Sequence, residues 1–358
     1  MANCKYQSKI EVIEFLISRA MAKTTRYTIA TLNLLNFAAP PYSFYQLHES
    51  YNDTQWQTKL QFITGMIEHL NPTIIAFQEV FSIQTLQLLC EDLGLPYFTT
   101  VATPKPDPVY PNVLFNPVVA VASKVPFKTA QALEPCPELL EYLNNQQHFE
   151  FNRTPVKCTF ELPGFGELAL YAVHFKSQRV HSMAHMLKNE NQDDPLLNLL
   201  HQTVGQMQSQ ISRSLEASIV YYDALKTQRE KHTPTIVLGD FNDHITNAAL
   251  SFMTQSFPPN TDLSLPDSVG LADVFHLADN AFSFDKKPPS HYYHGKGNVL
   301  DYILASKEFN PHMPTSPINA LRYISLDKHL DPERSDEDIR YSDHASIAIE
   351  FEVYIQSA

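Results

Sequence analysis

Several short apolar segments of this chain end in side chains that can bind a cation or move a proton. Asn33 interrupts the segment TIATLNLL, Glu79 closes TIIAFQE, and His174 closes LALYAVH. Further along the chain the same pattern recurs, with Asp240 and Asn242 after TIVLG, Asp301 at the start of DYILAS, and Asp343 and His344 just before the last apolar run. Strands that each end in an acid, an amide or an imidazole direct these groups to one rim of a sheet.

This set of side chains predicts a particular chemistry. Carboxylate and amide oxygens with two imidazoles suit Mg²⁺, Mn²⁺ or Ca²⁺ better than a structural zinc ion. A hard cation and two histidines can hydrolyse a phosphate ester, because the cation offsets phosphoryl charge while one imidazole activates water and the other protonates the leaving oxygen. Alone, Glu79 is an ordinary solvated strand end and His174 an ordinary core histidine. Their joint placement at strand ends favours the catalytic interpretation.

The elements that must position these groups alternate along the chain. Leu60, Ile63, Ile67 and Leu70 recur at helical spacing and predict a helix that ends at Asn71-Pro72. We expect helices over 54–70, 83–93 and 203–228, and strands over 27–35, 73–79, 117–123, 156–162, 168–175, 234–241, 298–305 and 345–354. Mixing of strands and helices throughout favours one α/β or α+β domain.

Three stretches do not fit this regular pattern. A polar insertion is expected over 176–200, and long proline-rich loops over 255–297 and 309–342, which in a compact domain usually form functional rims. The loop segment FSFDKKPPSHYYHG (282–295) combines lysines with aromatic residues, which suits single-stranded nucleic acid, although a solvated loop is the more common explanation.

The N-terminus predicts an extension and no membrane signal. We expect residues 1–24 to be an extension, either a helix or a start-site artefact with Met21 as the true start, and 25–358 to be one domain. Glu11 and Glu14 interrupt the only apolar stretch before it, so no signal peptide is expected. No apolar run approaches the ~20 residues that a bilayer requires. The prediction is a cytoplasmic protein without stable membrane insertion.

Composition excludes several functions. The 358 residues include only 9 glycines, and neither GxGxxG nor GxxxxGK[ST] occurs, which argues against Rossmann or P-loop nucleotide binding. A formal net charge of −13 argues against a general binder of the phosphate backbone, because such binding needs clustered lysine and arginine. It does not exclude an enzyme that meets phosphate through a bound cation.

Six segments carry a resemblance to a known family. They are TLNLLNF, IIAFQEV, YAVHFKS, VLGDFND, LDYILAS and YSDHASI, and they span residues 31–347. In this order they resemble the endonuclease/exonuclease/phosphatase superfamily, which includes pancreatic-type deoxyribonuclease, abasic-site endonucleases, inositol polyphosphate 5-phosphatases and neutral sphingomyelinases. The resemblance implies a single-domain, four-layer α/β/β/α sandwich of the deoxyribonuclease I type. Its site would lie at the rim where the two sheets meet.

The resemblance also implies a role for each matched residue. Asn33, Glu79 and Asp343 would belong to the metal site, with Glu79 as the principal carboxylate ligand. His174 would protonate the leaving group or hold the phosphate. The remaining roles concern water and its activation: Asp240 and Asn242 would orient the attacking water and bind phosphate oxygens, and His344 would be the general base, oriented by Asp301.

Three basic residues are weaker candidates for binding the substrate. Arg153 and Lys176 could meet a phosphate or form surface contacts, and Arg213 matches an arginine of bacterial members or pairs with Glu216 on its helix. The resulting prediction is a nuclease-type phosphodiesterase that uses Mg²⁺ (or Mn²⁺, or Ca²⁺) and acts on DNA or RNA. The alternatives are a phosphatase or a sphingomyelinase/phospholipase C-like hydrolase of a phosphorylated lipid or small molecule, and a catalytically dead binding module.

Overall fold

Two six-stranded sheets form the centre of the molecule in this computed structural model. The structure describes residues 24–142, 149–179, 194–254, 270–313, 316–330 and 341–354. The predicted N-terminal extension therefore lies outside the described residues, apart from Thr24 at the start of the first strand.

The first sheet combines the two ends of the described chain. Its order is β16 (Ile318–Leu326), β17 (Ser346–Tyr354), β1 (Thr24–Phe37), β3 (Ile74–Val80), β7 (Val118–Ser123) and β4 (Tyr97–Thr100). β1 and β3 run parallel, with Asn33 opposite Gln78 before the register shifts. The carboxyl ends of these two strands therefore lie side by side.

The second sheet brings three of the predicted residues into register. Its order is β12 (Ala272–Asp273), β15 (Asp301–Ala305), β11 (Thr235–Asp240), β10 (Gly166–His174), β9 (Val156–Leu162) and β8 (Phe127–Ala132). His174 lies opposite Asp240 in the parallel pair β10–β11, and Asp240 lies opposite Asp301 in the antiparallel pair β11–β15. Backbone pairing alone thus places three polar side chains on neighbouring strands.

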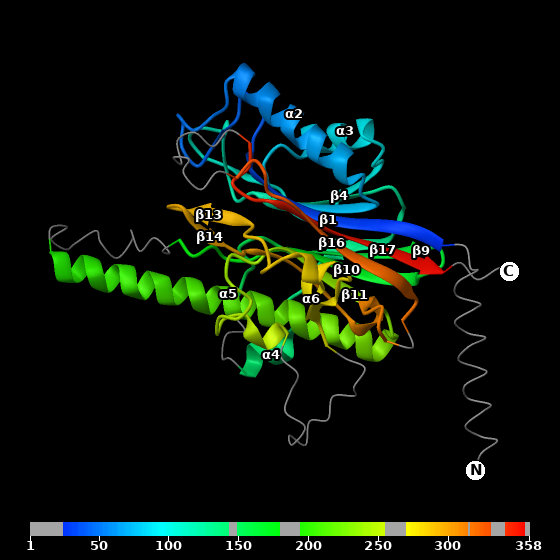
Figure 1. The fold of residues 1–358 in the computed structure, drawn as a ribbon. Coiled ribbons are helices and arrows are strands. Elements are labelled where there is room, and N and C mark those ends of the chain that lie inside the picture. Colours follow the sequence, from blue (N-terminus) through cyan, green and yellow to red (C-terminus); the bar gives the residue numbers. More distant parts are fainter. Residues whose placement is uncertain are drawn as a thin grey trace, which may run out of the picture.

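The two sheets pack on each other and carry helices on their outer faces (Figure 1). Side chains such as Ile29, Val121, Leu170 and Ile303 form the apolar core between the sheets. On the outer face of the first sheet, a second core joins it to helices α2 (Asp53–Leu70) and α3 (Ile83–Asp92). A third core joins the second sheet to helix α5 (Pro195–Lys231) and the short α4 (Pro137–Tyr142). The predicted four-layer α/β/β/α sandwich is confirmed.

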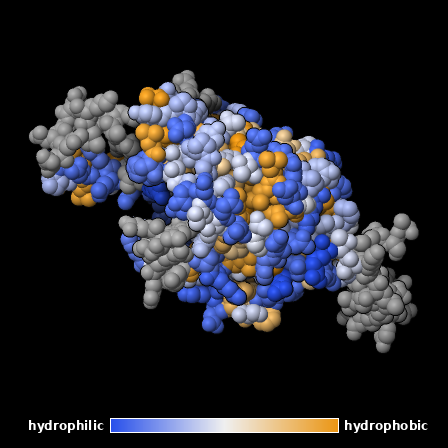
Figure 2. All heavy atoms as spheres, turned by 90° about the horizontal axis from the view of Figure 1, so that it is seen from above, coloured by the Kyte–Doolittle hydropathy of each residue, from blue (hydrophilic) through white to orange (hydrophobic). Residues whose placement is uncertain are grey.

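Helix α2 shows how local sequence fixes an element. Asn52 and Gln55 form a capping box at its start, and Asn71 adopts a left-handed conformation at its end, just before Pro72. On the side of the molecule that carries α2 and α3, much of the surface is hydrophilic, with apolar residues scattered in it (Figure 2). This pattern is expected for helices that bury a single face.

The remaining short elements lie around the sandwich. They are β2 (Ser43–Phe44), β5 (Lys105–Pro106), β6 (Val113–Phe115), α6 (Val274–Leu277), the hairpin β13 (His291–Tyr293) and β14 (Lys296–Asn298), and the 3₁₀ turns η2 (Ser251–Met253), η3 (Ala281–Ser283) and η4 (Lys307–Phe309). Among the described helices, none is both long and apolar enough to cross a membrane.

Three sequence predictions of secondary structure were wrong. The predicted loop over 255–297, of which the structure describes 270–297, contains β12, α6, η3 and β13. The polar insertion over 176–200 overlaps α5, which begins at Pro195 because Asp194 caps its first turn and proline suits the first helical position. The predicted loop over 309–342 contains β16, whose backbone pairs with β17 in antiparallel register, a contact that a pattern search along the chain does not reveal. Part of each of the last two stretches, 180–193 and 331–340, lies outside the described residues.

Candidate active site

The carboxyl ends of β1, β3, β10 and β11 meet at one rim, where the two sheets are joined by polar side chains. Asn33 Nδ2 from the first sheet donates a hydrogen bond of 3.1 Å to Asp240 Oδ2 in the second. His174 Nε2 lies 3.4 Å from the same oxygen. Asn33, His174 and Asp240 are almost fully buried. The site therefore exists only where both sheets are packed together.

The backbone around these side chains adopts conformations that residues with a Cβ rarely occupy. Leu35, Asn36, Glu79 and Asn242 all have φ between 48° and 62°. The last residues of β1 curl over Glu79, so that the Asn36 amide donates 2.9 Å to Glu79 Oε2. Such strained positions persist where the surrounding structure holds them, and they often mark functional sites.

Gly239 is required by the close approach of β10 and β11. Its φ is +139°, and a Cβ at this position would lie 2.0 Å from the carbonyl oxygen of Val173. Any larger residue would push β11 away from β10. The glycine of the GDFND segment therefore sets the distance between Asp240 and His174.

His344 is held by two neighbours. Its Nδ1 lies 2.8 Å from Asp301 Oδ2, which leaves Nε2 directed at the rim, 3.9 Å from Asp240 Oδ2. Ser342 Oγ donates 2.7 Å to the Asn33 carbonyl and accepts from the His344 amide, which ties the SDH segment to β1. Burial disfavours the imidazolium, but the carboxylates of Asp301, Asp240 and Asp343 outweigh it and raise the pKa of His344 well above its usual value.

The donor set at this rim fits a divalent cation. Burial raises the pKa of Asp240 to about 7, with Asp301 and Glu79 among the charges that act on it. Asp301 Oδ1 and Asn36 Oδ1 are buried and have no hydrogen-bond partner within the described part of the chain. Buried carboxylates and orphaned oxygens are the ligands that hard cations prefer, and a cation would relieve their crowding.

His174 occupies a different electrostatic environment from His344. Burial and the positive charge of Arg153, followed by His344 and Lys176, hold the pKa of His174 well below its usual value. The two histidines on either side of Asp240 thus have pKa values displaced in opposite directions. Pairs of titratable groups separated in this way are typical of acid–base sites.

Basic side chains lie on the His174 side of the rim. The buried carboxylate of Glu216 on α5 accepts hydrogen bonds from the Asn152 amide (2.8 Å) and the Lys176 amide (2.7 Å), which holds both segments. Arg153 is half-buried and close enough to act on His174, and Lys176 Nζ is bonded to the Ser177 and Arg179 carbonyls at 3.3 Å. Both predicted phosphate contacts therefore lie beside the site.

Arg213 has a different position. It is buried on α5, where its guanidinium donates to Asp243 Oδ2 at 2.9 and 3.2 Å and to the Lys176 carbonyl at 2.8 Å. Asp243 takes the place of Glu216, the ion-pair partner considered from the sequence. The arginine supports the segment that carries Lys176 and Asp243 from behind.

Two residues near the site were not found from the sequence. His291, on β13, forms a backbone bridge with His344. Lys59 is fully buried on α2, and its ammonium donates 2.7 Å to each of the Leu35 and Tyr341 carbonyls. A lysine on the apolar face of a predicted helix was the available signal for the second, but its partners lie far along the chain.

The lysine–aromatic stretch over 282–295 is only partly a surface loop. Lys287 is bonded to Asp273 Oδ2 at 2.6 Å, and its ammonium lies 4.1 Å from the centre of the Tyr302 ring. Burial lowers the pKa of Lys287, while Asp273 raises it. This lysine therefore makes its contacts inside the protein and is not available to bind a nucleic acid strand.

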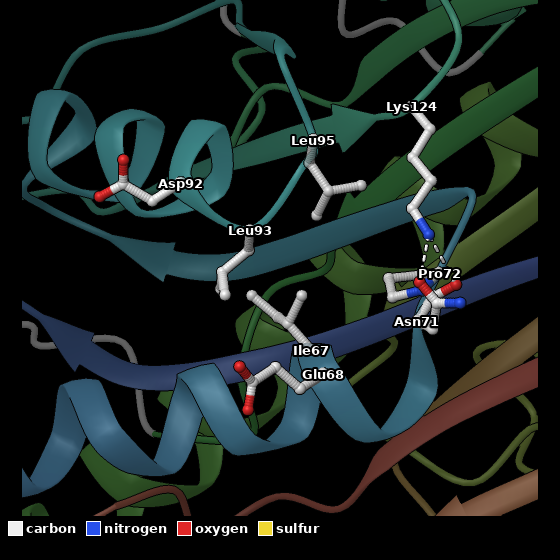
Figure 3. A pocket seen from close by; sticks show the side chains of 8 residues that line it. All are labelled: Ile67, Glu68, Asn71, Pro72, Asp92, Leu93, Leu95 and Lys124. Carbon is white, nitrogen blue, oxygen red and sulfur yellow. Dashed lines mark hydrogen bonds between the residues drawn. The ribbon is translucent and has the colours of Figure 1, made fainter.

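A separate pocket of about 470 Å³ lies at the opposite end of β3 (Figure 3). It is lined by residues from the ends of α2 and α3, and Lys124 reaches across it to donate to Asn71. It contains none of the predicted site residues, and its carboxylates, Glu68 and Asp92, come from the outer helices. The catalytic groups are not at this pocket.

The comparisons with known proteins agree with this fold. The sequence profile of the Endonuclease/Exonuclease/phosphatase family matches residues 30–344, so the chain belongs to this family of phosphoesterase hydrolases. A comparison with curated proteins finds no match.

Three solved structures illustrate the shared fold. A humanized D. rerio TDP2 has a TM-score of 0.53 at 13% identity, covering 91% of this chain and 98% of that one. The human Nocturnin catalytic domain has a TM-score of 0.52 at 16% identity, covering 93% and 98%. Truncated Caenorhabditis elegans TDP2 has a TM-score of 0.51 at 11% identity, covering 91% and 97%. At these identities the likeness shows the fold alone.

Proposed function

We propose that this protein is a divalent-cation-dependent phosphodiesterase of the nuclease type, acting on DNA or RNA. The observation that carries the proposal is the placement of two imidazoles, His174 and His344, 3.4 and 3.9 Å from one oxygen of Asp240. A phosphate bound there would have a proton donor and a proton acceptor on different sides.

In the proposed reaction, each group of residues has a separate role. Asp301 fixes the tautomer of His344, whose Nε2 accepts a proton from water once the charge of the neighbouring carboxylates is offset. Asp240 and Asn242 orient the water and the phosphate oxygens. His174, neutral in the free protein, is close to Arg153 and Lys176, which would hold the phosphate against it. A phosphate bound beside His174 would favour the imidazolium, so that His174 takes up a proton from solvent and passes it to the leaving oxygen.

A divalent cation would be held by Glu79, Asp343 and Asn33, and when bound it would offset phosphoryl charge. Mg²⁺ and Mn²⁺ suit this oxygen-rich set. The proposal gains indirect support from the neighbouring fold, since the human Nocturnin structure is described with a bound sulfate anion, which has the shape of a phosphate.

The test is a substrate panel with Mg²⁺: single-stranded DNA, RNA, plasmid DNA, and the diester and monoester of p-nitrophenyl phosphate. We expect cleavage of diesters by the wild type, and losses of about 10³-fold or more in His344→Ala and Glu79→Gln, because each removes a group needed in the transition state. His312→Ala is the matched control, because this histidine is largely exposed and its ion-pair partner is Asp279, outside the site.

Two outcomes contradict the proposal. Hydrolysis of monoesters alone would support a phosphatase. Equal activity of His344→Ala and wild type would remove His344 from the role of base.

A further inference from the structure

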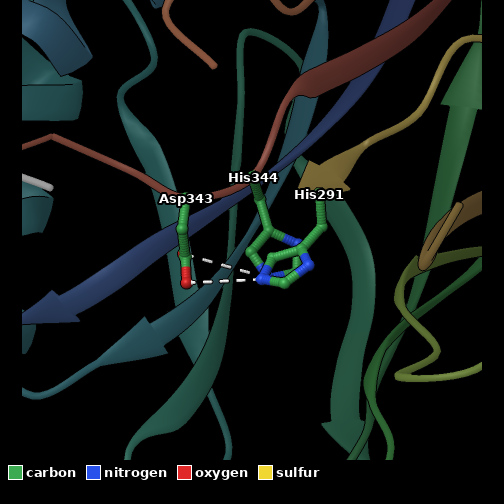
Figure 4. Close-up of side chains that lie close together, drawn as sticks. All are labelled: His291, Asp343 and His344. Carbon is green, nitrogen blue, oxygen red and sulfur yellow. Dashed lines mark ion pairs between the residues drawn. The ribbon is translucent and has the colours of Figure 1, made fainter. Parts of the chain in front are cut away.

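His291, Asp343 and His344 form a second group of metal-ligand type at the rim of the site. His291 Nε2 lies 3.8 Å from Asp343 Oδ2, and His344 Nε2 lies 3.9 Å from Asp343 Oδ1. One ligand atom from each residue lies within 4.8 Å of the other two. Figure 4 shows both imidazoles directed toward the Asp343 carboxylate.

The strand that carries His291 is fixed to the SDH segment. His291 and His344 face each other in an antiparallel bridge, and the Ala345 amide donates 2.8 Å to the Ser290 carbonyl. Ser290 Oγ accepts from the amides of Leu300 and Asp301, which ties the same hairpin to β15. The two imidazoles therefore keep their positions relative to each other through the backbone.

The group is prepared to bind an ion from solvent. Asp301 occupies Nδ1 of His344, so Nε2 is the nitrogen left to bind, and a carboxylate behind a metal-bound histidine is a common arrangement. The side chains of His291 and Asp343 are 17% and 23% exposed, which gives an ion a path inward.

Two imidazoles and one carboxylate select a different cation from an oxygen-rich site. They suit Zn²⁺ and related transition metals, whereas Mg²⁺ prefers oxygen ligands. With Zn²⁺ bonds of about 2.0–2.1 Å, tetrahedral ligand atoms lie about 3.3 Å apart. The separations of 3.8 and 3.9 Å involve different oxygens of Asp343, and all three ligand atoms lie within 4.8 Å of one another, so the side chains need to close by about 0.5 to 1.5 Å to reach this distance.

We propose that His291, Asp343 and His344 form an inhibitory site for Zn²⁺ or a similar transition-metal cation. The inference rests on the proposed function, because it requires His344 to be the general base. An ion on His344 Nε2 occupies the lone pair that would accept the proton of water. It also engages Asp343, a residue that the activating cation needs.

Binding is tested without any substrate, on the full chain. Zn²⁺ affinity is measured by competition with a chromophoric chelator, and Co²⁺ binding by its visible absorption spectrum. We expect wild type to bind one equivalent at this site, and His291→Phe and His291→Gln each to weaken binding at least about tenfold, because each removes one ligand. His294→Phe is the matched control, an exposed histidine on the turn of the same hairpin, and should bind as wild type does.

Inhibition is tested by adding Zn²⁺ to enzyme saturated with Mg²⁺, each variant being compared with its own rate without Zn²⁺. Wild type and His294→Phe should be inhibited at similar Zn²⁺ concentrations, and the His291 variants only at about tenfold higher ones. Equal Zn²⁺ affinity of wild type and both His291 variants overturns the site. Tight binding without inhibition overturns its inhibitory role. If no substrate is cleaved in Mg²⁺, the proposed function and inhibition fail together, while the binding measurements still decide the metal site.

Discussion

At the scale of single residues, the site is organised around Asp240. Its carboxylate accepts hydrogen bonds from Asn33, from Asn242 and from the Asn242 amide, and both imidazoles lie within 4 Å of it. The buried aspartate thereby fixes the distance between the groups proposed as acid and base. Their opposite pKa shifts then follow from what lies beyond them, carboxylates around His344 and basic residues around His174.

A substitution of Asp301 should show whether the proposed site needs the charge of this residue or only its shape. Asp301→Asn keeps the shape of the side chain but removes the negative charge that holds Nδ1–H of His344. We expect the rate of diester cleavage to fall by about 10²-fold or more, with the substrate KM little changed, because the tautomer and the basicity of His344 are both lost. Steady-state kinetics and far-ultraviolet circular dichroism measure this. A comparable loss in KM alone would assign Asp301 to substrate binding instead.

At the scale of elements, α2 does more than cover the first sheet. Lys59 connects the end of β1, which carries Asn36, to the segment before Asp343, through the Leu35 and Tyr341 carbonyls. Ser342 makes a second connection between the same two regions by bonding to the Asn33 carbonyl. The first and last parts of the site are thus joined by a helix and by a serine.

The buried ammonium of Lys59 predicts a dependence of stability on pH. Burial lowers its pKa from 10.5 to about 7, although Asp343 and Glu79 favour the charged form. Between these values the unfolded chain binds more protons than the folded one, so the free energy of unfolding rises with pH, by up to about 1.4 kcal/mol per pH unit from this residue.

Urea unfolding in EDTA from pH 7 to 9.5 should show this rise in wild type and not in Lys59→Met. Lys59→Arg is the matched control, because arginine keeps its charge over the whole range and should also lack the rise. If Lys59→Arg retained the wild-type slope, another group would be its source.

The elements that carry catalytic groups were predictable because each is a short apolar run with a polar end. The residues that were missed have partners far along the chain, so a local pattern does not show what they do. Lys59 donates a hydrogen bond to Tyr341, and His291 pairs with His344, so both depend on residues distant in the sequence. In the same way, β16 is recognised only through its pairing with β17. The early start of α5 could have been predicted from Asp194 as a capping residue and Pro195 as the first helical residue. The polar composition of the sequence around them favoured a loop instead.

At the scale of the whole molecule, the net charge of −13 limits how a nucleic acid can be held. A local basic region, Arg153 and Lys176, faces the site, while the formal charge of the whole chain is strongly negative. Binding should therefore depend on the divalent cation that offsets the carboxylates at the rim.

This dependence can be measured with the inactive variant His344→Ala and a labelled single-stranded oligonucleotide. In Mg²⁺ we expect an affinity at least about tenfold higher than in EDTA at the same ionic strength, and further weakening as NaCl increases. Fluorescence anisotropy reports both effects. Equal binding in Mg²⁺ and EDTA would mean that the basic residues alone hold the strand.

The hydrogen bond between Asn33 and Asp240, together with the position of the SDH segment, has a consequence for the growing polypeptide. The groups proposed for catalysis are drawn from both sheets and from positions between residues 33 and 344. A nascent chain that has not yet reached His344 lacks its base, and without the packed second sheet its metal ligands stand apart. A nuclease of the kind proposed would therefore be unable to cleave the messenger RNA from which it is being translated until the domain is complete.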